Sequence, residues 1–164
     1  MTQLIEDGLL EQEEDTQKGK YLTFSMGDEM YGIEIQYVTE IIGIQRITEV
    51  PDQLEYIRGI INLRGKIIPV MDVRLRFKKP FREYNERTCI VVIDTGDITI
   101  GLIVDGVSEV LVIQEEDIVL PPEINRERQN YIKAIGKVGA DVKLILDCEK
   151  LLSDGDMERL SDAC

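Results

Sequence analysis

The sequence predicts a mainly β protein made of two copies of one small, five-stranded unit. A shift of 69 positions aligns Tyr21–Gln45 with Ile90–Gln114 and gives seven identities in 25 pairs, where ordinary composition gives about two. A shift of 75 positions then aligns Tyr56–Asp72 with Tyr131–Asp147. The chain is 43% hydrophobic but only 5% aromatic and has no Trp, so Ile, Val and Leu must build the core. Such a β-branched composition favours strands.

Each copy opens with a hairpin. A Gly-Asp pair, Gly27-Asp28 or Gly96-Asp97, lies at the same place in both copies. Glycine adopts the positive φ that tight hairpin turns require, so this pair is turn chemistry and needs no functional explanation. The flanking strands are expected at Tyr21–Met26 with Met30–Ile35, and at Cys89–Thr95 with Ile98–Val104.

A third strand and a second hairpin complete each copy. In each copy, prolines break the strand pattern and force a loop between the third strand and the second hairpin. They stand at Val50-Pro51 in the first copy and at Leu120-Pro121-Pro122 in the second. The second hairpin turns at Arg64-Gly65 in one copy and at Gly139-Ala140-Asp141 in the other. The expected strands are Val38–Ile44, Ile57–Leu63 and Lys66–Val73, with counterparts Val107–Ile113, Ile132–Val138 and Val142–Asp147.

These elements divide the chain into an arm, a folded domain and a tail. We expect an acidic mobile arm over residues 1–18, a folded domain over 19–152 and a helical tail over 153–164. Within the domain the copies span about 20–80 and about 88–152. Five short strands are enough for each copy to close a small barrel and remove its exposed edges.

Short helices are expected at the carboxyl end. The pattern predicts one over Asp147–Leu152 and another over Ser153–Leu160. Ser153 followed by Asp156 resembles a capping box at the start of the second helix.

The net charge of −13 argues against nucleic acid or an anionic membrane surface as a main partner. No run approaches the roughly 20 apolar residues that a membrane-spanning helix needs, so no membrane insertion is expected. Cys89 and Cys148 lie in apolar surroundings without a C-x-x-C pair. They are interpreted as small buried hydrophobes in a reducing cytoplasm, and metal binding by them is disfavoured.

The chain contains no histidine. This excludes histidine-based catalytic triads, the H-E-x-x-H metal site and phospho-histidine relay chemistry. The acidic runs Glu13-Glu14-Asp15 and Glu115-Glu116-Asp117 could hold a divalent ion, but a solvated surface explains them better because neither has the spacing of a calcium loop. We therefore expect a non-enzyme without cofactor or metal, although a general acid–base carboxylate pair stays possible among 32 acidic residues.

The second hairpins differ between the copies. Arg64 stands at the turn of the first copy, where the second copy has Gly139. This arginine is either a solvated turn tip, or is fixed by a carboxylate such as Glu40 and presents donors to a partner. Two further differences are Asn62 for Lys137 and Gly59 for Ala134.

Pro69 is a second asymmetry, since its counterpart is Leu144. Proline has no N–H to donate to a ladder, so the strand that contains it is expected at a sheet edge or at a bulge. Such an edge is either a docking surface for another barrel or a harmless feature.

Six segments stand in a characteristic order and spacing: Tyr31–Ile35, Val38–Ile41, Val50-Pro51, Tyr56–Gly65, Pro69–Arg74 and Gly101–Val110. Together they resemble the CheW family of bacterial chemotaxis coupling proteins. The likeness runs from about Tyr21 to Leu152 and is highly specific as a whole, although Asn-Leu-Arg-Gly alone would be weak.

The resemblance implies two SH3-like five-stranded barrels packed across a hydrophobic seam. It implies a non-enzymatic adaptor, monomeric when free, that couples chemoreceptor cytoplasmic tips to the histidine kinase CheA. Such a protein is cytoplasmic and is recruited to membrane-bound receptor arrays, where the kinase's regulatory domain has the same fold. Carried onto this chain, the receptor- and kinase-binding residues are Val38, Glu40, Gly59, Asn62, Arg64, Val107 and Val110.

Two other classes of protein fit parts of the sequence. The chain could be the regulatory domain of a multidomain kinase, or of a receiver-containing adaptor, in isolation. Met1 and the tail ending at Cys164 favour a stand-alone protein. A small-molecule-binding barrel or a hydrolase has only the excess of acidic residues in its favour.

Overall fold

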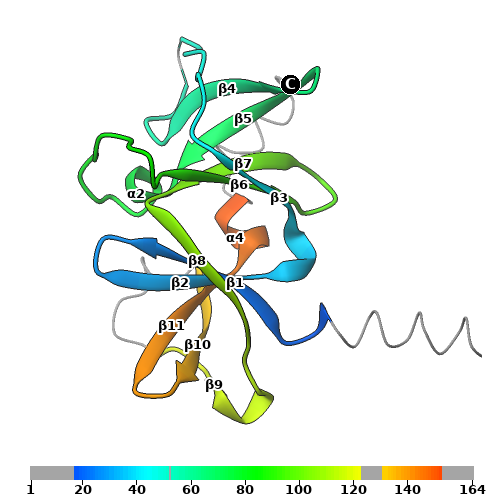
Figure 1. Ribbon diagram of the computed structural model, residues 1–164, viewed down its shortest axis with the longest axis vertical. Coiled ribbons are helices and arrows are strands. Elements are labelled where there is room, and N and C mark those ends of the chain that lie inside the picture. Colours follow the sequence, from blue (N-terminus) through cyan, green and yellow to red (C-terminus); the bar gives the residue numbers. More distant parts are fainter. Residues whose placement is uncertain (1–16, 52, 123–130, 153–164) are drawn as a thin grey trace, which may run out of the picture.

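The computed structural model describes residues 17–51, 53–122 and 131–152. It contains two sheets, which form the upper and lower halves of the molecule in Figure 1. The upper sheet has the order β3-β6-β7-β5-β4, and the lower has the order β8-β1-β2-β11-β10-β9. The mainly β prediction is confirmed. The strands are β1 (Lys20–Met26), β2 (Glu29–Glu34), β3 (Val38–Gly43), β4 (Ile57–Leu63), β5 (Lys66–Asp72), β6 (Cys89–Asp94), β7 (Thr99–Val104), β8 (Gly106–Val112), β9 (Ile118–Val119), β10 (Ile132–Val138) and β11 (Asp141–Leu146).

The two copies exchange their first hairpins. The β1–β2 hairpin lies between β8 and β11 of the second copy, and the β6–β7 hairpin lies between β3 and β5 of the first. The expectation that residues 20–80 and 88–152 each close a barrel of their own is therefore corrected. The chain changes sheets at η1 (Ile35–Tyr37), after the first hairpin, and at Asp105, after its counterpart.

The exchanged hairpins pair with equivalent residues in the two sheets. In the upper sheet Val70 pairs with Gly101 in parallel, and in the lower sheet the equivalent pair is Ile145 with Gly32. The antiparallel partner of Val38 is Ile93, and the residues shifted by 69 positions, Val107 and Phe24, are also partners. The duplication seen in the sequence is thus a duplication of pairing register.

Each sheet closes through the continuation of its third strand. Beyond β3 the chain bends until Thr48 exchanges two backbone hydrogen bonds of 2.9 Å with Ile60 of β4. In the lower sheet the chain beyond β8 passes through η2 (Glu115–Asp117) to β9, which pairs with β10. Both sheets are therefore curved into five-stranded barrels, if β8 and β9 are counted as one bent strand.

The inner hairpins are buried on both faces. Along β6, Ile90 and Val92 lie in the interior of the upper barrel, whereas Val91 and Ile93 lie in the seam between the barrels. The seam holds the larger cluster and receives side chains from both sheets. Each fully buried Ile or Val contributes about 2 kcal/mol through removal of apolar surface from water. Because β6 is buried on both faces, its sequence is continuously apolar and does not alternate with polar residues.

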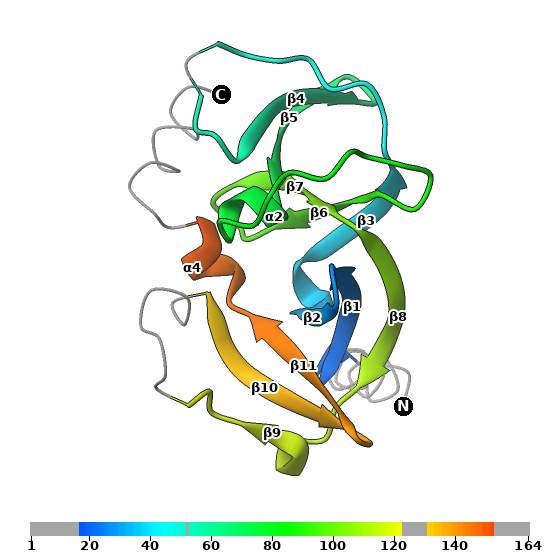
Figure 2. The same cartoon turned by 90° about the vertical axis from the view of Figure 1, so that its left-hand side faces the viewer.

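Two short helices occupy equivalent places after the second hairpins. Helix α2 (Val73–Arg76) begins after Asp72, whose Oδ1 accepts the Arg74 N–H at 3.0 Å. Helix α4 (Cys148–Leu152) begins after Asp147, whose Oδ1 accepts the Lys150 N–H at 3.0 Å. Figure 2 shows α4 between the two sheets, in the seam. The predicted helix over Asp147–Leu152 is confirmed.

The remaining terminal predictions lie outside the described residues. They concern the acidic arm, apart from Gln17 and Lys18, and the helix over Ser153–Leu160. The acidic run Glu13-Glu14-Asp15 falls in the same undescribed part of the chain.

The edge position expected for Pro69 is wrong. Its strand, β5, lies between β4 and β7. The partner of Pro69 on β4 is Ile60, whose N–H and C=O both bond Thr48 on the far side of β4. Pairing with β7 starts only at Val70. The missing N–H therefore costs no ladder hydrogen bond, and the docking edge suggested for this strand does not exist.

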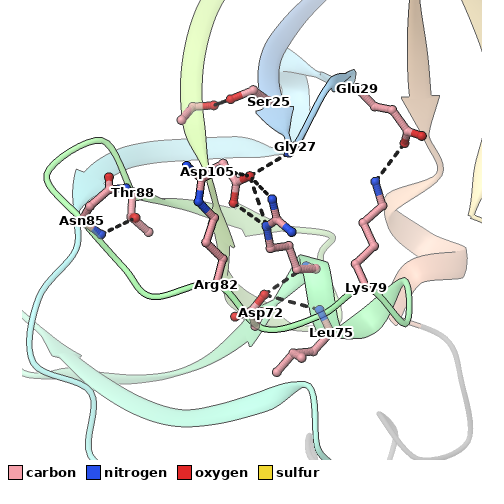
Figure 3. A network of polar contacts seen from close by, with 12 residues as sticks. Ser25, Gly27, Glu29, Asp72, Leu75, Lys79, Arg82, Asn85, Thr88 and Asp105 are labelled. Carbon is pink, nitrogen blue, oxygen red and sulfur yellow. Dashed lines mark hydrogen bonds and ion pairs between the residues drawn. The ribbon is translucent and has the colours of Figure 1, made fainter.

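An ion pair fixes the second crossover between the sheets. Arg74 Nε donates to Asp105 Oδ1 at 2.9 Å, and its Nη2 donates to Oδ2 at 2.7 Å. Figure 3 shows the same carboxylate accepting the Gly27 N–H, at 2.7 Å, with Arg82 Nη1 at 3.6 Å. At the first crossover Lys133 pairs with Glu34.

The protonation of Asp105 is linked to this ion pair. Burial raises the pKa of the Asp105 carboxyl, but hydrogen bonds from Arg74 and Gly27, with the charges of Arg74 and Arg82, outweigh burial. The net effect is a pKa below the ordinary value of 3.8. A carboxyl with a lowered pKa stabilises the folded state above its unfolded pKa, and this stabilisation is lost as the pH falls through the folded pKa.

We expect Asp105→Asn to lower the free energy of unfolding at pH 7 by about 2 kcal/mol, because it removes the charge facing Arg74 in a mostly buried pair. Urea denaturation followed by circular dichroism measures the change. Asp97→Asn, at an exposed hairpin turn, is the matched control and should change it by less than about 0.5 kcal/mol. Equal effects of the two variants would contradict a role for the crossover pair.

We also expect the stability difference between Asp105→Asn and the wild type to depend on pH. It should be constant well above the ordinary carboxyl pKa of 3.8, and it should shrink as the pH falls from there through the lowered pKa of the folded carboxyl. Denaturation curves at a series of pH values test this, and a difference that persists unchanged to pH 2 would refute it.

Candidate functional site

The turn between β4 and β5 holds Arg64 in an uncommon backbone conformation. Arg64 and Gly65 both have positive φ, 53° and 87°, the pattern of a type I′ hairpin turn. Glycine adopts this conformation at no steric cost, whereas arginine does so at a cost of about 1 kcal/mol. The side chain of Asn62 stabilises the turn, since its Oδ1 accepts the Gly65 N–H at 2.8 Å.

This turn brings Arg64 to Glu40 of β3. The Arg64 Nη2 donates to both carboxylate oxygens of Glu40, at 2.7 and 2.5 Å. The side chain of Arg64 is 74% exposed and that of Glu40 is 24% exposed. The hydrogen bond and charge of Glu40 raise the pKa of the guanidinium. The predicted pairing of Arg64 with Glu40 is therefore observed, while the presentation of donors to a partner stays a prediction.

The pair presents unused donors on the surface of the upper barrel. Arginine carries five N–H donors in a rigid fork, and the hydrogen bonds found among the described residues use only Nη2 of Arg64. The carboxylate restricts the guanidinium to one region without enclosing it. The chemistry offered is a pre-oriented cation for a carbonyl or carboxylate of a partner.

The second copy cannot form this arrangement. The equivalent of Glu40 is Glu109, but Gly139 replaces Arg64. Gly139 has nearly the same φ as Arg64, 61°, but Ala140, the counterpart of Gly65, does not share the positive φ of 87° found at Gly65. The two turns therefore differ in backbone conformation as well as in the side chain at this position.

Gly59 is buried in β4 and does not reach the surface. Its φ is 145°, and a Cβ there would lie 2.1 Å from the Thr48 carbonyl oxygen. That carbonyl accepts the Ile60 N–H and so closes the upper barrel. A replacement at Gly59 would therefore act on the barrel itself, and a direct contact with a partner has no support from its position.

Two of the three predicted valines lie at the seam. Val38 begins β3 and Val107 lies near the start of β8, and both are partly buried against the seam cluster. Val110, further along β8, is 51% exposed. The structure thus places Val38 two residues from Glu40, while Val107 and Val110 belong to the lower barrel. Their binding roles stay predictions.

Sequence reasoning missed the exposed Ile41, which follows Glu40 and is 43% exposed. Its counterpart at a shift of 69 is the predicted residue Val110, so extending the comparison of copies would have found it. The pair Arg74–Asp105 was also missed. The counterparts of these residues are Glu149 and Gln36, so the second copy does not repeat the pair and the internal repeat does not reveal it.

The described residues offer no metal centre and no membrane-spanning helix. They contain no group of three or more Cys, Asp or Glu side chains placed to hold a metal ion. None of the described helices is long and apolar enough to cross a membrane. A polar pocket of about 180 Å³ opens beside Asp105, but its charged groups Arg74 and Asp105 already bond one another.

Comparison with known proteins places this geometry in a family. Residues 20–156 match the family described as the CheW-like domain. The chain belongs to the CheW-like family. Its relatives include the chemotaxis protein CheW of Klebsiella aerogenes, 37% identical with 84% of each chain covered. They also include that of Bacillus subtilis, 34% identical with 81% of this chain and 86% of the relative covered.

A solved structure agrees with the CheW-like fold. The crystal structure of the scaffolding protein TtCheW from Thermoanaerobacter tengcongensis is 35% identical, with a TM-score of 0.78, and the match covers 84% of this chain and 94% of that one. The CheW-like family consists of non-catalytic scaffold proteins of chemotaxis, so the expectation of a non-enzyme is confirmed.

Gly59→Ala should lower the free energy of unfolding by about 3 kcal/mol, because its Cβ would overlap the Thr48 carbonyl. Gly43→Ala, in β3 with no atom within 4 Å of a new Cβ, is the control and should change stability by less than about 0.5 kcal/mol. Thermal unfolding measures both. A stable Gly59→Ala protein that fails only in partner binding would show that Gly59 acts at an interface after all.

Proposed function

We propose that this chain couples the cytoplasmic tips of chemoreceptors to the histidine kinase CheA, as a cytoplasmic adaptor recruited to membrane-bound receptor arrays. The proposal refines the scaffold role of the CheW-like family. An adaptor needs oriented charges beside apolar surface, and it needs no nucleophile or metal.

The observation that carries the proposal is the pair of Arg64 and Glu40, present in one barrel only. The equivalent hairpin of the other barrel forms with Gly139 in place of Arg64, so a hairpin at this place does not require the pair. A cation that is held in place and yet 74% exposed suits a contact that orients a partner more than it binds tightly.

Apolar surface lies on both third strands. Ile41 of β3 and Val110 of β8 are equivalent and are both about half exposed, at 43% and 51%. A hollow of about 790 Å³ lies between the start of β1, η1 and the end of β8, next to the exposed Val112. An amphipathic helical tip of a receptor could place its apolar face against such surface. Individual contacts would be modest, and the array would supply avidity.

Arg64→Ala should leave the fold intact and weaken co-sedimentation with a receptor cytoplasmic fragment by about tenfold, the loss expected for one oriented, exposed charge contact. Circular dichroism reports the fold in parallel. Glu40→Gln should weaken co-sedimentation in the same direction, because the guanidinium loses the anion that holds it.

Gly139→Arg is the matched control. It places the same side chain at the equivalent turn of the other barrel, where a new Cβ has no atom within 4 Å but meets the strain of a φ of +61°. Circular dichroism must show that this variant is folded, and its co-sedimentation should then change little. Unchanged binding by a folded Arg64→Ala protein would contradict the proposal, and loss of folding together with binding would make Arg64 structural. Repeating the assay with CheA present separates kinase contacts from receptor contacts.

A further inference from the structure

Arg76 ends helix α2 and is buried, with 7% of its surface exposed. Arginine is almost never fully buried unless its charge is compensated. The burial of this charge therefore needs a structural reason, and neither the packing of the barrel interiors nor the site at Arg64 supplies it.

The guanidinium of Arg76 lies between two tyrosine rings. Its Cζ is 4.6 Å from the ring centroid of Tyr56 and 4.5 Å from that of Tyr131. A planar guanidinium binds aromatic faces through cation–π attraction and stacking, and more strongly when water is excluded. Its Nη2 also donates to the Leu151 carbonyl of α4 at 3.3 Å.

The two tyrosines belong to different barrels and are equivalent positions of the repeat. Tyr56 immediately precedes β4, and Tyr131 immediately precedes β10. Their carbonyls accept the N–H groups of Asp72 and Asp147, the residues before α2 and α4, at 2.7 and 2.8 Å. A group that contacts both rings at nearly the same distance lies close to the axis that relates the two copies.

Only one copy supplies such a cation. At a shift of 75 the counterpart of Arg76 is Leu151, which is fully buried. One arginine thus serves two equivalent tyrosines, and the neighbouring ring of Phe77 continues the stack from Tyr131, at 5.8 Å, to Tyr31 of β2, at 5.5 Å. The stack connects the loop before β4, helix α2 and the hairpin that the lower barrel receives from the first copy.

We propose that Arg76 is a positioning residue that fixes the angle between the two barrels. The apolar contacts of the seam are non-directional, so they resist separation of the barrels more than rotation of one against the other. A guanidinium that contacts two rings and donates a hydrogen bond to a carbonyl is directional. Removing it frees the rotation while each barrel keeps its own core.

A consequence for binding rests on the proposed function. A receptor tip that contacts β3 of one barrel and β8 of the other requires one particular angle between them. When the distribution of angles is broader, a smaller fraction of molecules has the angle that the receptor tip requires. The apparent affinity for the receptor tip falls in proportion to that fraction.

The test measures the angle directly by double electron–electron resonance. Spin labels are attached to cysteines replacing Ile67 of β5 and Val142 of β11, which are equivalent positions, 51% and 56% exposed, one in each barrel. Cys89 and Cys164 are replaced by serine. Cys148 stays, because it is buried and burial raises the pKa of its thiol to about 12, so it does not react with the label.

Arg76→Gln keeps a planar amide but loses the cation, and should broaden the distance distribution about twofold relative to the unsubstituted protein. Arg76→Lys keeps the cation without the plane and should give an intermediate width. Arg87→Gln, which removes an exposed arginine of the same connecting segment, should leave the distribution unchanged.

A folded Arg76→Gln protein with the original distribution would overturn the proposal. If Arg76→Gln does not fold, Arg76→Lys is decisive, since a width equal to that of the unsubstituted protein would overturn the proposal equally. Co-sedimentation with a receptor fragment should fall about fivefold for Arg76→Gln. The distance measurement needs no partner. A failure of the proposed function therefore does not contradict the role of Arg76 in fixing the angle, and an unchanged distance distribution does not contradict the proposed function.

Discussion

The whole structure depends on two hairpins that are covered over most of both faces. Hairpins β1–β2 and β6–β7 each bury one face in a barrel interior and the other in the seam. Both hairpins occupy inner positions in their sheets, with a hydrogen-bonded neighbour on each side. The third strands and the second hairpins are then wrapped around them, and the crossovers at η1 and Asp105 follow from the same arrangement.

The candidate site lies where this constraint ends. Arg64 stands on a turn that contributes nothing to the seam, so its conformation is set locally by Asn62 and Gly65 and its direction by Glu40. The second barrel tolerates glycine at the same place because the turn does not need a side chain. A surface turn that does not pack against the core can change its side chains without loss of the fold. Two otherwise equivalent barrels can therefore present different surfaces.

The sequence predicted the strands, the Gly-Asp turns and the partner of Arg64, because each of these depends on residues close in the chain or on a single charge pair. The exchange of hairpins was not predictable, since the internal repeat specifies a pairing register and that register is the same whichever copy supplies the hairpin. The binding role of Gly59, implied by the resemblance, stays a prediction. Its structural constraint comes from the Thr48 carbonyl, which leaves no mark in the sequence pattern. Pro69 was placed at an edge because proline is compatible with an inner strand only when its neighbour, here Ile60, bonds elsewhere. Arg76 lies four residues beyond the aligned stretches, which end at Asp72 and Asp147, and its counterpart Leu151 differs in kind, so the internal repeat does not single it out.

The reciprocal exchange also sets the order of events during synthesis. When the first 80 residues have left the ribosome, β1–β2 lacks both of its outer neighbours, β8 and β11, and β3 lacks β6. Neither half can complete a sheet alone, so the nascent first half must keep its apolar hairpin from aggregating until the second half is made. The contacts that finish both barrels join residues far apart in the chain, which slows folding. Although two copies of one motif are present, the polypeptide is a single cooperative unit that cannot be divided between them.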